Sequence, residues 1–247
     1  MQLNQARAVS FGIEHFRSLF PLNRGSIMWQ INDCWPVVSW AAVDSLRHRK
    51  PLWYALRRVY AERLLTVQPR EAGLAVAFHN DSTEPVSAHL MMVRLTVDGE
   101  VLAEHELRVD VDTRSLTEVT LPESVAIPSD GTSEFISITS SSGERAFWYF
   151  VEDTHLALRA DAAHATASET EHGYLVRVEA TGLVKDLTIL ADKVDPDASV
   201  DEALVTLLPG ESRDFVVRAR RDLDASEFAS VRVVRSTNDL VAAARNA

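Results

Sequence analysis

The side chains that could do chemistry are most concentrated between residues 29 and 40, where three tryptophans stand among polar residues. Trp29 is followed by Asn32 and Asp33, and then by Trp35. An indole offers a flat apolar surface, whereas an amide and a carboxylate offer hydrogen-bonding atoms. Together they could contact a ligand that has both apolar faces and hydrogen-bonding groups. These four residues are therefore our candidate binding residues.

Structural roles could explain several residues of the same region. Trp35, Trp40 and Trp53 could pack a helix against the rest of the fold, and packing is our interpretation for the last two. Asp33 could equally cap the turn that follows it. Cys34, as the single cysteine, is expected to be a small buried side chain.

The rest of the sequence offers no second kind of chemistry. The eight histidines are dispersed and show no metal-ligand spacing, so we predict neither a metal site nor a cofactor. One cysteine excludes an internal disulfide framework. The basic runs at 47–50 and 57–58 are typical of the solvated face of a helix.

Composition excludes some partners. The formal net charge of −11 argues against nucleic acid and against an anionic membrane surface, because both attract clustered Lys and Arg. No apolar run approaches the roughly 20 residues of a membrane span. The first 16 residues lack the features of a signal peptide, which predicts a cytoplasmic location. They are typical of the middle of a helix, as if the chain were cut from something longer.

Residues 1–65 have the pattern helix, strand, helix. Val9, Ile13, Phe16 and Phe20 recur at helical spacing, and Pro51 stands at a plausible first helical position. The apolar run 26–31 between the two helices is typical of a strand buried in a parallel sheet. Such an α-β-α unit belongs to an α/β fold and needs neighbouring strands to complete its hydrogen bonds.

From about residue 66 the hydrophobic period becomes alternating, and turn signals recur without a helical stretch between them. This pattern predicts two immunoglobulin-like β-sandwiches, at 66–152 and 153–247, the second with a short C-terminal tail. Asp98-Gly99 is expected to form a tight hairpin turn. Further strands are expected at 156–159, 174–180, 187–191, 203–207, 214–219 and 231–234.

The stretch from Gly25 to Trp40, with its continuation through Lys50-Pro51, resembles the segment around the eighth barrel strand in β-mannosidases of glycoside hydrolase family 2. The resemblance is closest at Trp29-Gln30, at Asn32-Asp33-Cys34-Trp35-Pro36, at Ser39-Trp40 and at Lys50-Pro51. It extends more weakly over the remaining chain. The implied fold class is mainly β: the last α-β-α piece of a (β/α)8 barrel in residues 1–65, followed by the two sandwiches.

The resemblance also implies roles for these residues. Trp29 matches the aromatic platform of the subsite for the scissile sugar, with Asn32, Asp33 and Trp35 around it. The implied substrate is a β-mannoside or a mannose-terminated oligosaccharide. In this family a Glu after an Asn is the acid/base, and a Glu on the seventh strand is the nucleophile. The chain contains no Asn-Glu dipeptide and strand seven would precede residue 1, so no catalytic residue is predicted.

Three interpretations remain from the sequence. The chain could be the C-terminal portion of a retaining exo-β-mannosidase, inactive alone, whose partner is the missing N-terminal part of the enzyme. It could instead be a stand-alone, non-catalytic β-sandwich module that binds carbohydrate or protein. A related family 2 enzyme with a different sugar preference is a third possibility.

Overall fold

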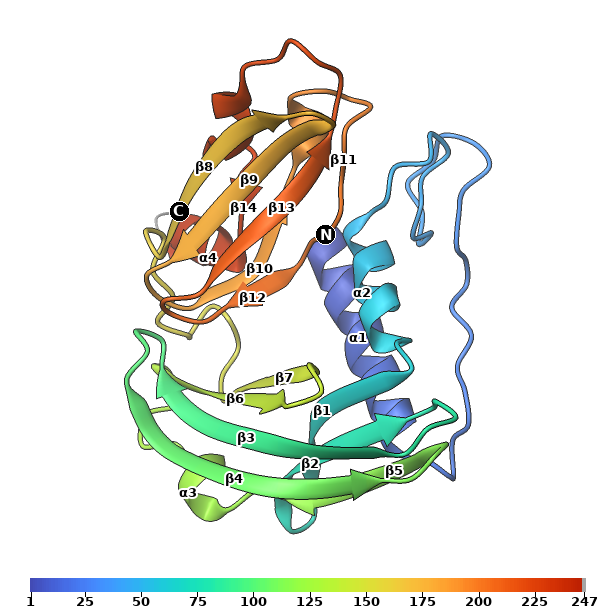
Figure 1. Ribbon diagram of the computed structural model, residues 1–247, viewed down its shortest axis with the longest axis vertical. Helices are drawn as coiled ribbons and strands as arrows, with labels where there is room; N and C mark the ends of the chain where they lie inside the picture. The colour runs from blue at the N-terminus through green and yellow to red at the C-terminus, as the bar shows by residue number, and fades with distance from the viewer. Residues whose placement is uncertain (246–247) are drawn as a thin grey trace.

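Two helices lie side by side along one flank of the computed structural model, which describes residues 1–245 (Figure 1). They are α1 (Gln2–Ser18) and α2 (Pro51–Val59), and α2 begins at Pro51 as predicted. Ile13 of α1 packs in one apolar cluster with Leu52 and Leu56 of α2. Burying a leucine of this kind stabilises a fold by roughly 1.5–3 kcal/mol, so this cluster holds the pair of helices together.

The expected apolar stripe of α1 is only partly buried. Val9 and Ile13 join the cluster with α2, whereas Phe16 is largely exposed. Phe20 lies beyond the end of the helix, edge-on to the ring of His79. The contact with α2 therefore covers one narrow face of α1, and the helix leaves part of its stripe open.

The strand expected over residues 26–31 is not formed. These residues run without regular structure, and Ile27 is 96% exposed. The nearest ladder contact is a single parallel bridge between Asn32 and Val43. A parallel strand needs neighbours for its N–H and C=O groups. Among the described residues the backbone of this run is bonded only at its end, where the N–H groups of Ala42 and Val43 donate to the carbonyl oxygens of Gln30 and Ile31 at 3.2 and 2.8 Å.

The first sandwich packs two antiparallel sheets face to face. The three-stranded sheet has the order β1-β2-β5 and the four-stranded sheet the order β4-β3-β6-β7. Their elements are β1 (Arg63–Arg70), β2 (Gly73–Asn80), β3 (Val86–Thr96), β4 (Val101–Val111), β5 (Ser115–Thr120), the short helix α3 (Glu123–Ala126), β6 (Glu134–Ser140) and β7 (Arg145–Tyr149). An apolar core fills the space between the sheets, and the antiparallel strands begin at Arg63.

The second unit also contains two antiparallel sheets, ordered β11-β13-β9-β8 and β12-β10-β14. The elements are β8 (Ala163–Thr170), β9 (Gly173–Ala180), β10 (Val184–Ile189), η1 (Ala191–Lys193), β11 (Ser199–Val200), β12 (Val205–Leu207), β13 (Ser212–Arg218), η2 (Ala225–Ala229), β14 (Val234–Arg235) and α4 (Thr237–Arg245). No strand forms at the expected position 156–159, because Leu156 and Leu158 pack between the two sandwiches instead. The expected tail is helical as far as residue 245, and its last two residues lie outside the described part.

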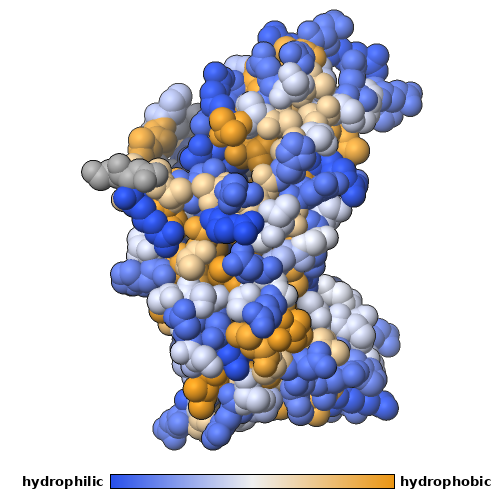
Figure 2. Space-filling model, turned by 90° about the vertical axis from the view of Figure 1, so that its left-hand side faces the viewer, coloured by the Kyte–Doolittle hydropathy of each residue, from blue (hydrophilic) through white to orange (hydrophobic). Residues whose placement is uncertain are grey.

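The two sandwiches and the helices are joined by apolar contacts. Leu95 and Phe135 of the first sandwich pack with Leu183 of the second. Tyr54 of α2 is part of the second sandwich's core and donates a hydrogen bond to the carbonyl oxygen of Val200 at 2.9 Å. Figure 1 shows the helices alongside both sandwiches, and the outline of the molecule narrows between the sandwiches in Figure 2.

The fold is thus mainly β, with several antiparallel sheets, as the alternating pattern predicted. Asp98-Gly99 forms the predicted hairpin turn between β3 and β4, where the Gly99 N–H donates to the carbonyl oxygen of Thr96 at 2.9 Å. Among the described residues, no helix combines the length and the apolar character needed to cross a membrane.

Candidate functional site

The residues singled out by the sequence lie in an exposed irregular segment between α1 and α2. Trp29 is 70% exposed and Trp35 is 63% exposed, and Asn32 is exposed as well. Neither indole stacks on another aromatic ring of residues 1–245. The two tryptophans therefore offer apolar surface to solvent rather than to the protein core.

Asp33 differs from its neighbours because it is buried, at 6% exposure. The hydroxyl of Ser39 donates to its carboxylate at 2.7 Å, and the Lys50 ammonium donates to Oδ2 at 3.2 Å. The Ser39 hydrogen bond, with a smaller contribution from Lys50, lowers the pKa of Asp33. The side chain thus binds two ends of the segment together and stays ionised, and it makes no backbone cap of the following turn.

The structure brings only part of the motif together. Asn32 Nδ2 donates to the backbone carbonyl of Asp33 at 3.2 Å, whereas the indoles of Trp29 and Trp35 form no hydrogen bond with either residue. Contact of these four residues with a ligand stays a prediction.

Several expectations for the motif are wrong. Cys34 is exposed, and Trp40 is 56% exposed rather than packed. Lys50 was expected in solvent, yet only 13% of its side chain is exposed because it pairs with Asp33. These residues stand in an irregular segment whose apolar side has no covering element within residues 1–245. The packing role expected for Trp53 is confirmed, since it lies between both apolar clusters that α2 joins.

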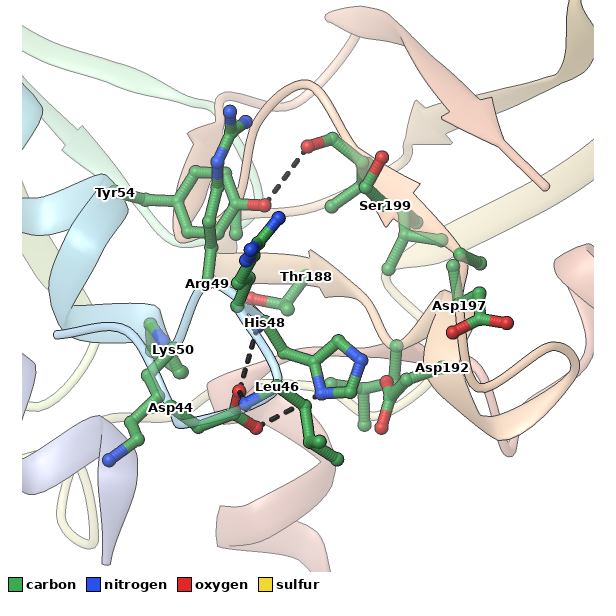
Figure 3. Close-up of a pocket in the computed structure, with 18 of the residues that line it drawn as sticks. Asp44, Leu46, His48, Arg49, Lys50, Tyr54, Thr188, Asp192, Asp197 and Ser199 are labelled. Atoms are coloured by element: carbon green, nitrogen blue, oxygen red, sulfur yellow. Dashed lines mark hydrogen bonds and ion pairs between the residues drawn. The ribbon is translucent and has the colours of Figure 1, made fainter. Parts of the chain in front are cut away.

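A cleft of about 540 Å³ lies between the loop before α2 and the second sandwich (Figure 3). Asp44 and His48 stand on the loop side, and Asp192 and Asp197 are contributed by the second sandwich. Asp44 accepts hydrogen bonds from the backbone N–H of Leu46 at 2.9 Å, from that of His48 at 2.8 Å and from His48 Nδ1 at 3.0 Å.

These hydrogen bonds decide what Asp44 can do. Burial works to raise its pKa, but the hydrogen bonds from His48 and Leu46 outweigh it, and the net effect is a lowered pKa. A carboxylate that is held ionised is a poor proton donor, and the three hydrogen bonds that Asp44 accepts hold the loop in place. We conclude that the Asp44–His48 pair shapes the loop.

A second polar cluster, missed by the sequence reasoning, ties α1 to the second sandwich. Arg7 forms ion pairs with Asp153 and with Asp186, and Lys185 also pairs with Asp153. Thr237 donates to Asp186 at 3.0 Å. The partners lie as far as 230 residues apart in the chain, so no local pattern could have revealed them. Among residues 1–245 no group of His, Cys, Asp and Glu is arranged to hold a metal ion.

Comparisons with known proteins extend the picture. No family model matches the chain. β-Mannosidase B of Aspergillus niger is 32% identical over 146 residues, which is 55% of this chain and 16% of that protein. β-Mannosidase B of Emericella nidulans is 30% identical over 140 residues, with the same two shares. β-Mannosidase B of Aspergillus flavus is 43% identical over 61 residues, or 24% of this chain. The chain thus matches about one sixth of the length of the first two relatives and 7% of the third.

Solved structures share the fold over nearly the whole chain. The β-D-mannosidase of Dictyoglomus thermophilum has a TM-score of 0.75 and 24% identity, and the match covers 95% of this chain and 28% of that one. The exo-chitosanase of Amycolatopsis orientalis has a TM-score of 0.64 and 18% identity, covering 96% of this chain and 33% of that one.

The architecture is therefore one that occurs within larger glycoside hydrolases. More particularly, the chain is a homologue of part of the β-mannosidases, which confirms the resemblance stated from the motif.

Proposed function

We propose that this chain is the C-terminal portion of a retaining exo-β-mannosidase, an enzyme that releases terminal β-D-mannose from non-reducing ends. In this proposal residues 26–31 become the eighth strand of a (β/α)8 barrel, α1 and α2 are the helices beside it, and the two sandwiches are immunoglobulin-like. The substrate would be a β-mannoside or a mannose-terminated oligosaccharide.

The observation that carries the proposal is the exposed motif segment. Ile27, Trp29, Ile31, Val38 and Trp40 are all large apolar residues that are more than half exposed. Burying one such side chain contributes on the order of 1.5–3 kcal/mol to the stability of the fold. Five exposed apolar side chains in one segment therefore strongly favour another part of the protein that covers them. The rest of a barrel would supply that surface, and it would give residues 26–31 the strand neighbours they lack.

The proposal makes the chain inactive by itself. A retaining glycosidase needs two carboxyl groups about 5–5.5 Å apart, one as nucleophile and one as acid/base. The carboxylates on the motif segment, Asp33 and Asp44, are each held in hydrogen bonds that fix loop structure. Trp29 would instead form the aromatic floor for the sugar, with Asn32 and Trp35 beside it, once the remaining barrel is present.

A first experiment assays the purified chain on a nitrophenyl β-mannoside. We expect no protein-dependent hydrolysis. A measurable hydrolysis rate that copurifies with the protein would contradict the proposed inactivity.

A second experiment reads the coding sequence upstream of Met1 and expresses it joined to this chain. We expect a strand that ends in Asn-Glu and another that ends in Glu. The joined polypeptide should hydrolyse the β-mannoside, and Trp29→Ala should lower kcat/KM by roughly 100-fold, as expected for a lost positioning contact. Trp53→Phe is the matched control and should leave activity near normal. An upstream sequence without the two glutamates would overturn the proposal.

The alternative is a stand-alone, non-catalytic module that binds carbohydrate or protein. Its support is that each sandwich has its own apolar core. This alternative does not explain why the large apolar side chains between residues 27 and 40 are exposed. It would be supported if the upstream coding sequence did not encode the rest of a barrel.

A further inference from the structure

The cleft of about 540 Å³ between the loop before α2 and the second sandwich adjoins the motif segment (Figure 3). Lys50 lines the cleft, and its ammonium donates at 3.2 Å to Asp33, the buried carboxylate of the motif. Pro51, the first residue of α2, lines the cleft as well. In the proposed barrel, the loop that follows residues 26–31 and the start of α2 lie at the catalytic face. The cleft therefore stands beside the proposed barrel mouth.

The loop wall of this cleft is held in one conformation. Asp44 accepts hydrogen bonds from the backbone N–H groups of Leu46 and His48, and from His48 Nδ1 at 3.0 Å. Because an ionised carboxylate only accepts hydrogen bonds, Nδ1 of His48 carries the proton of this pair. In the neutral imidazole Nε2 is then an acceptor, and it has no partner within residues 1–245. The wall presents this acceptor already ordered, which lowers the entropic cost of binding a ligand.

The opposite wall belongs to the second sandwich and carries charged groups that are open to a ligand. Asp192 of η1, Asp197 and Arg218 at the end of β13 are all exposed and line the cleft. The two ion pairs at the cleft lie on its loop side. Within residues 1–245 the side chains of these three residues form neither an ion pair nor a hydrogen bond. Their full hydrogen-bonding capacity is therefore available.

The charges of the lining are nearly balanced, and they point to the class of ligand. The basic side chains are Arg47, Arg49, Lys50 and Arg218, and the acidic ones are Asp44, Asp192 and Asp197. A carboxylate only accepts hydrogen bonds and a guanidinium only donates them, whereas a hydroxyl group does both. Neighbouring hydroxyls of a saccharide can therefore bond to both kinds of group, and a ligand with a net charge would be repelled by one of them. The volume is within the range of roughly 300–1,000 Å³ that holds small ligands.

We infer that this cleft binds the leaving-group side of a mannooligosaccharide, meaning the sugar units that follow the terminal mannose. The inference rests on the proposed function and adds to it a role for the second sandwich. Asp192 and Asp197 accept hydrogen bonds from the sugar hydroxyls, and Arg218 donates to them. None of residues 26–40 lines the cleft, so a terminal mannose placed on Trp29 does not itself occupy it. Only a substrate with a long leaving group gains these contacts.

The first test is saturation-transfer NMR of this chain with β-1,4-mannotriose. Arg218→Gln and Asp197→Asn should each weaken binding roughly tenfold, as expected for one lost charge-assisted hydrogen bond. Their melting temperatures should stay unchanged, because neither side chain has a partner within residues 1–245. Glu169→Gln, exposed on β8 and away from the cleft, is the matched control.

Two outcomes of this titration would overturn the inference. No saturation transfer at tens of millimolar mannotriose would show that the cleft holds only water. Loss of binding in Trp29→Ala, with normal binding in Arg218→Gln, would place the sugar on the motif segment. Neither outcome contradicts the proposed function.

The second test compares two substrates of the polypeptide joined to its upstream part, nitrophenyl β-mannoside and β-1,4-mannotetraose. Arg218→Gln and Asp197→Asn should lower kcat/KM for mannotetraose roughly tenfold, and the loss should be confined to this longer substrate. An equal loss on both substrates, or none on either, would overturn the inference and leave the proposed function standing. A joined polypeptide that hydrolyses neither substrate would refute the proposed function itself, and with it the leaving-group role of the cleft.

Discussion

Arg7 in α1 forms an ion pair with Asp186 in β10, across 179 positions of sequence. The same guanidinium pairs with Asp153, and all three side chains are at most about one third exposed. Because both carboxylates bind the one guanidinium of Arg7, they fix the orientation of α1 relative to the second sandwich. This cluster is the charged counterpart of the apolar contacts that Tyr54 makes from α2.

Arg7→Gln is expected to destabilise the protein by about 2 to 3 kcal/mol, because it leaves two carboxylates with only Lys185 between them. Breaking a buried pair costs about 3–5 kcal/mol, and the partial exposure of Arg7 reduces this cost. The measurement is the midpoint of urea unfolding at neutral pH. Arg177→Gln, in an exposed cross-strand cluster, is the control and should cost below about 0.5 kcal/mol. Equal losses in both variants would contradict a special role for Arg7.

Gly99→Ala should weaken the contact between the sandwiches. Gly99 has a φ of +99°, which L side chains rarely adopt, and an added Cβ would lie 2.8 Å from Cβ of Pro209 in the second sandwich. We expect a loss of about 2 kcal/mol in thermal unfolding, from backbone strain and the clash together. Gly143→Ala has a φ of +107° but open space around it, so it measures the strain alone. If the two variants lose the same stability, the contact with Pro209 contributes nothing.

Limited proteolysis should cut first between residues 22 and 40. Val38 is 96% exposed and this region has no regular secondary structure, whereas α1 is held by Arg7 and by Ile13. Exposed irregular backbone is the preferred site of nicking. Mass spectrometry should find a nicked protein in which residues 1–20 stay bound to the rest. Rapid loss of residues 1–20 after the first cut would show that α1 depends on the intact segment.

Stability should fall as pH rises from about 5 to 8, because of Glu14. Burial raises the pKa of Glu14 from 4.5 to about 7, and Arg58 opposes this only partly. Between these values the folded protein binds more protons than the unfolded chain, so each increase in pH favours unfolding. The total is about 2 to 3 kcal/mol after allowance for partial exposure. The cavity of about 580 Å³ that Glu14 lines has further charged groups. Arg7, Arg58, Arg145, Lys185, Asp186 and Glu202 are held in ion pairs, whereas Arg213 forms none among residues 1–245.

Glu14→Gln should abolish this decline when unfolding is measured by urea titration at several pH values. Glu171→Gln, on the exposed surface, should leave it in place. A parallel decline in the unchanged chain and in Glu14→Gln would mean that another group titrates.

Local patterns predicted the mainly β, antiparallel character of residues 63–235. The Asp98-Gly99 turn and the alternating residues around it specify a hairpin without help from distant parts of the chain. Strand β8 escaped notice because the residues it turns inward are small, Ala163, Ala165 and Ala167, and give a weak alternating signal.

The irregular segment shows why the rest could not be predicted. An apolar run such as 26–31 has the same composition whether or not partner strands lie beside it, and pairing is a property of neighbours. The exposure of Cys34 and Trp40 follows from the same cause. Ion pairs such as Arg7 with Asp186 join residues whose proximity is set only by the complete fold.

The place of Tyr54 in the core of the second sandwich has a consequence for the order of events during synthesis. Residues 63–149 can close into the first sandwich as soon as they leave the ribosome, because all seven strands are then present. Tyr54 precedes them, yet Phe215 and Val233, which belong to the same apolar core, follow them in the chain. The two helices therefore stay incompletely packed until the second sandwich has been synthesised.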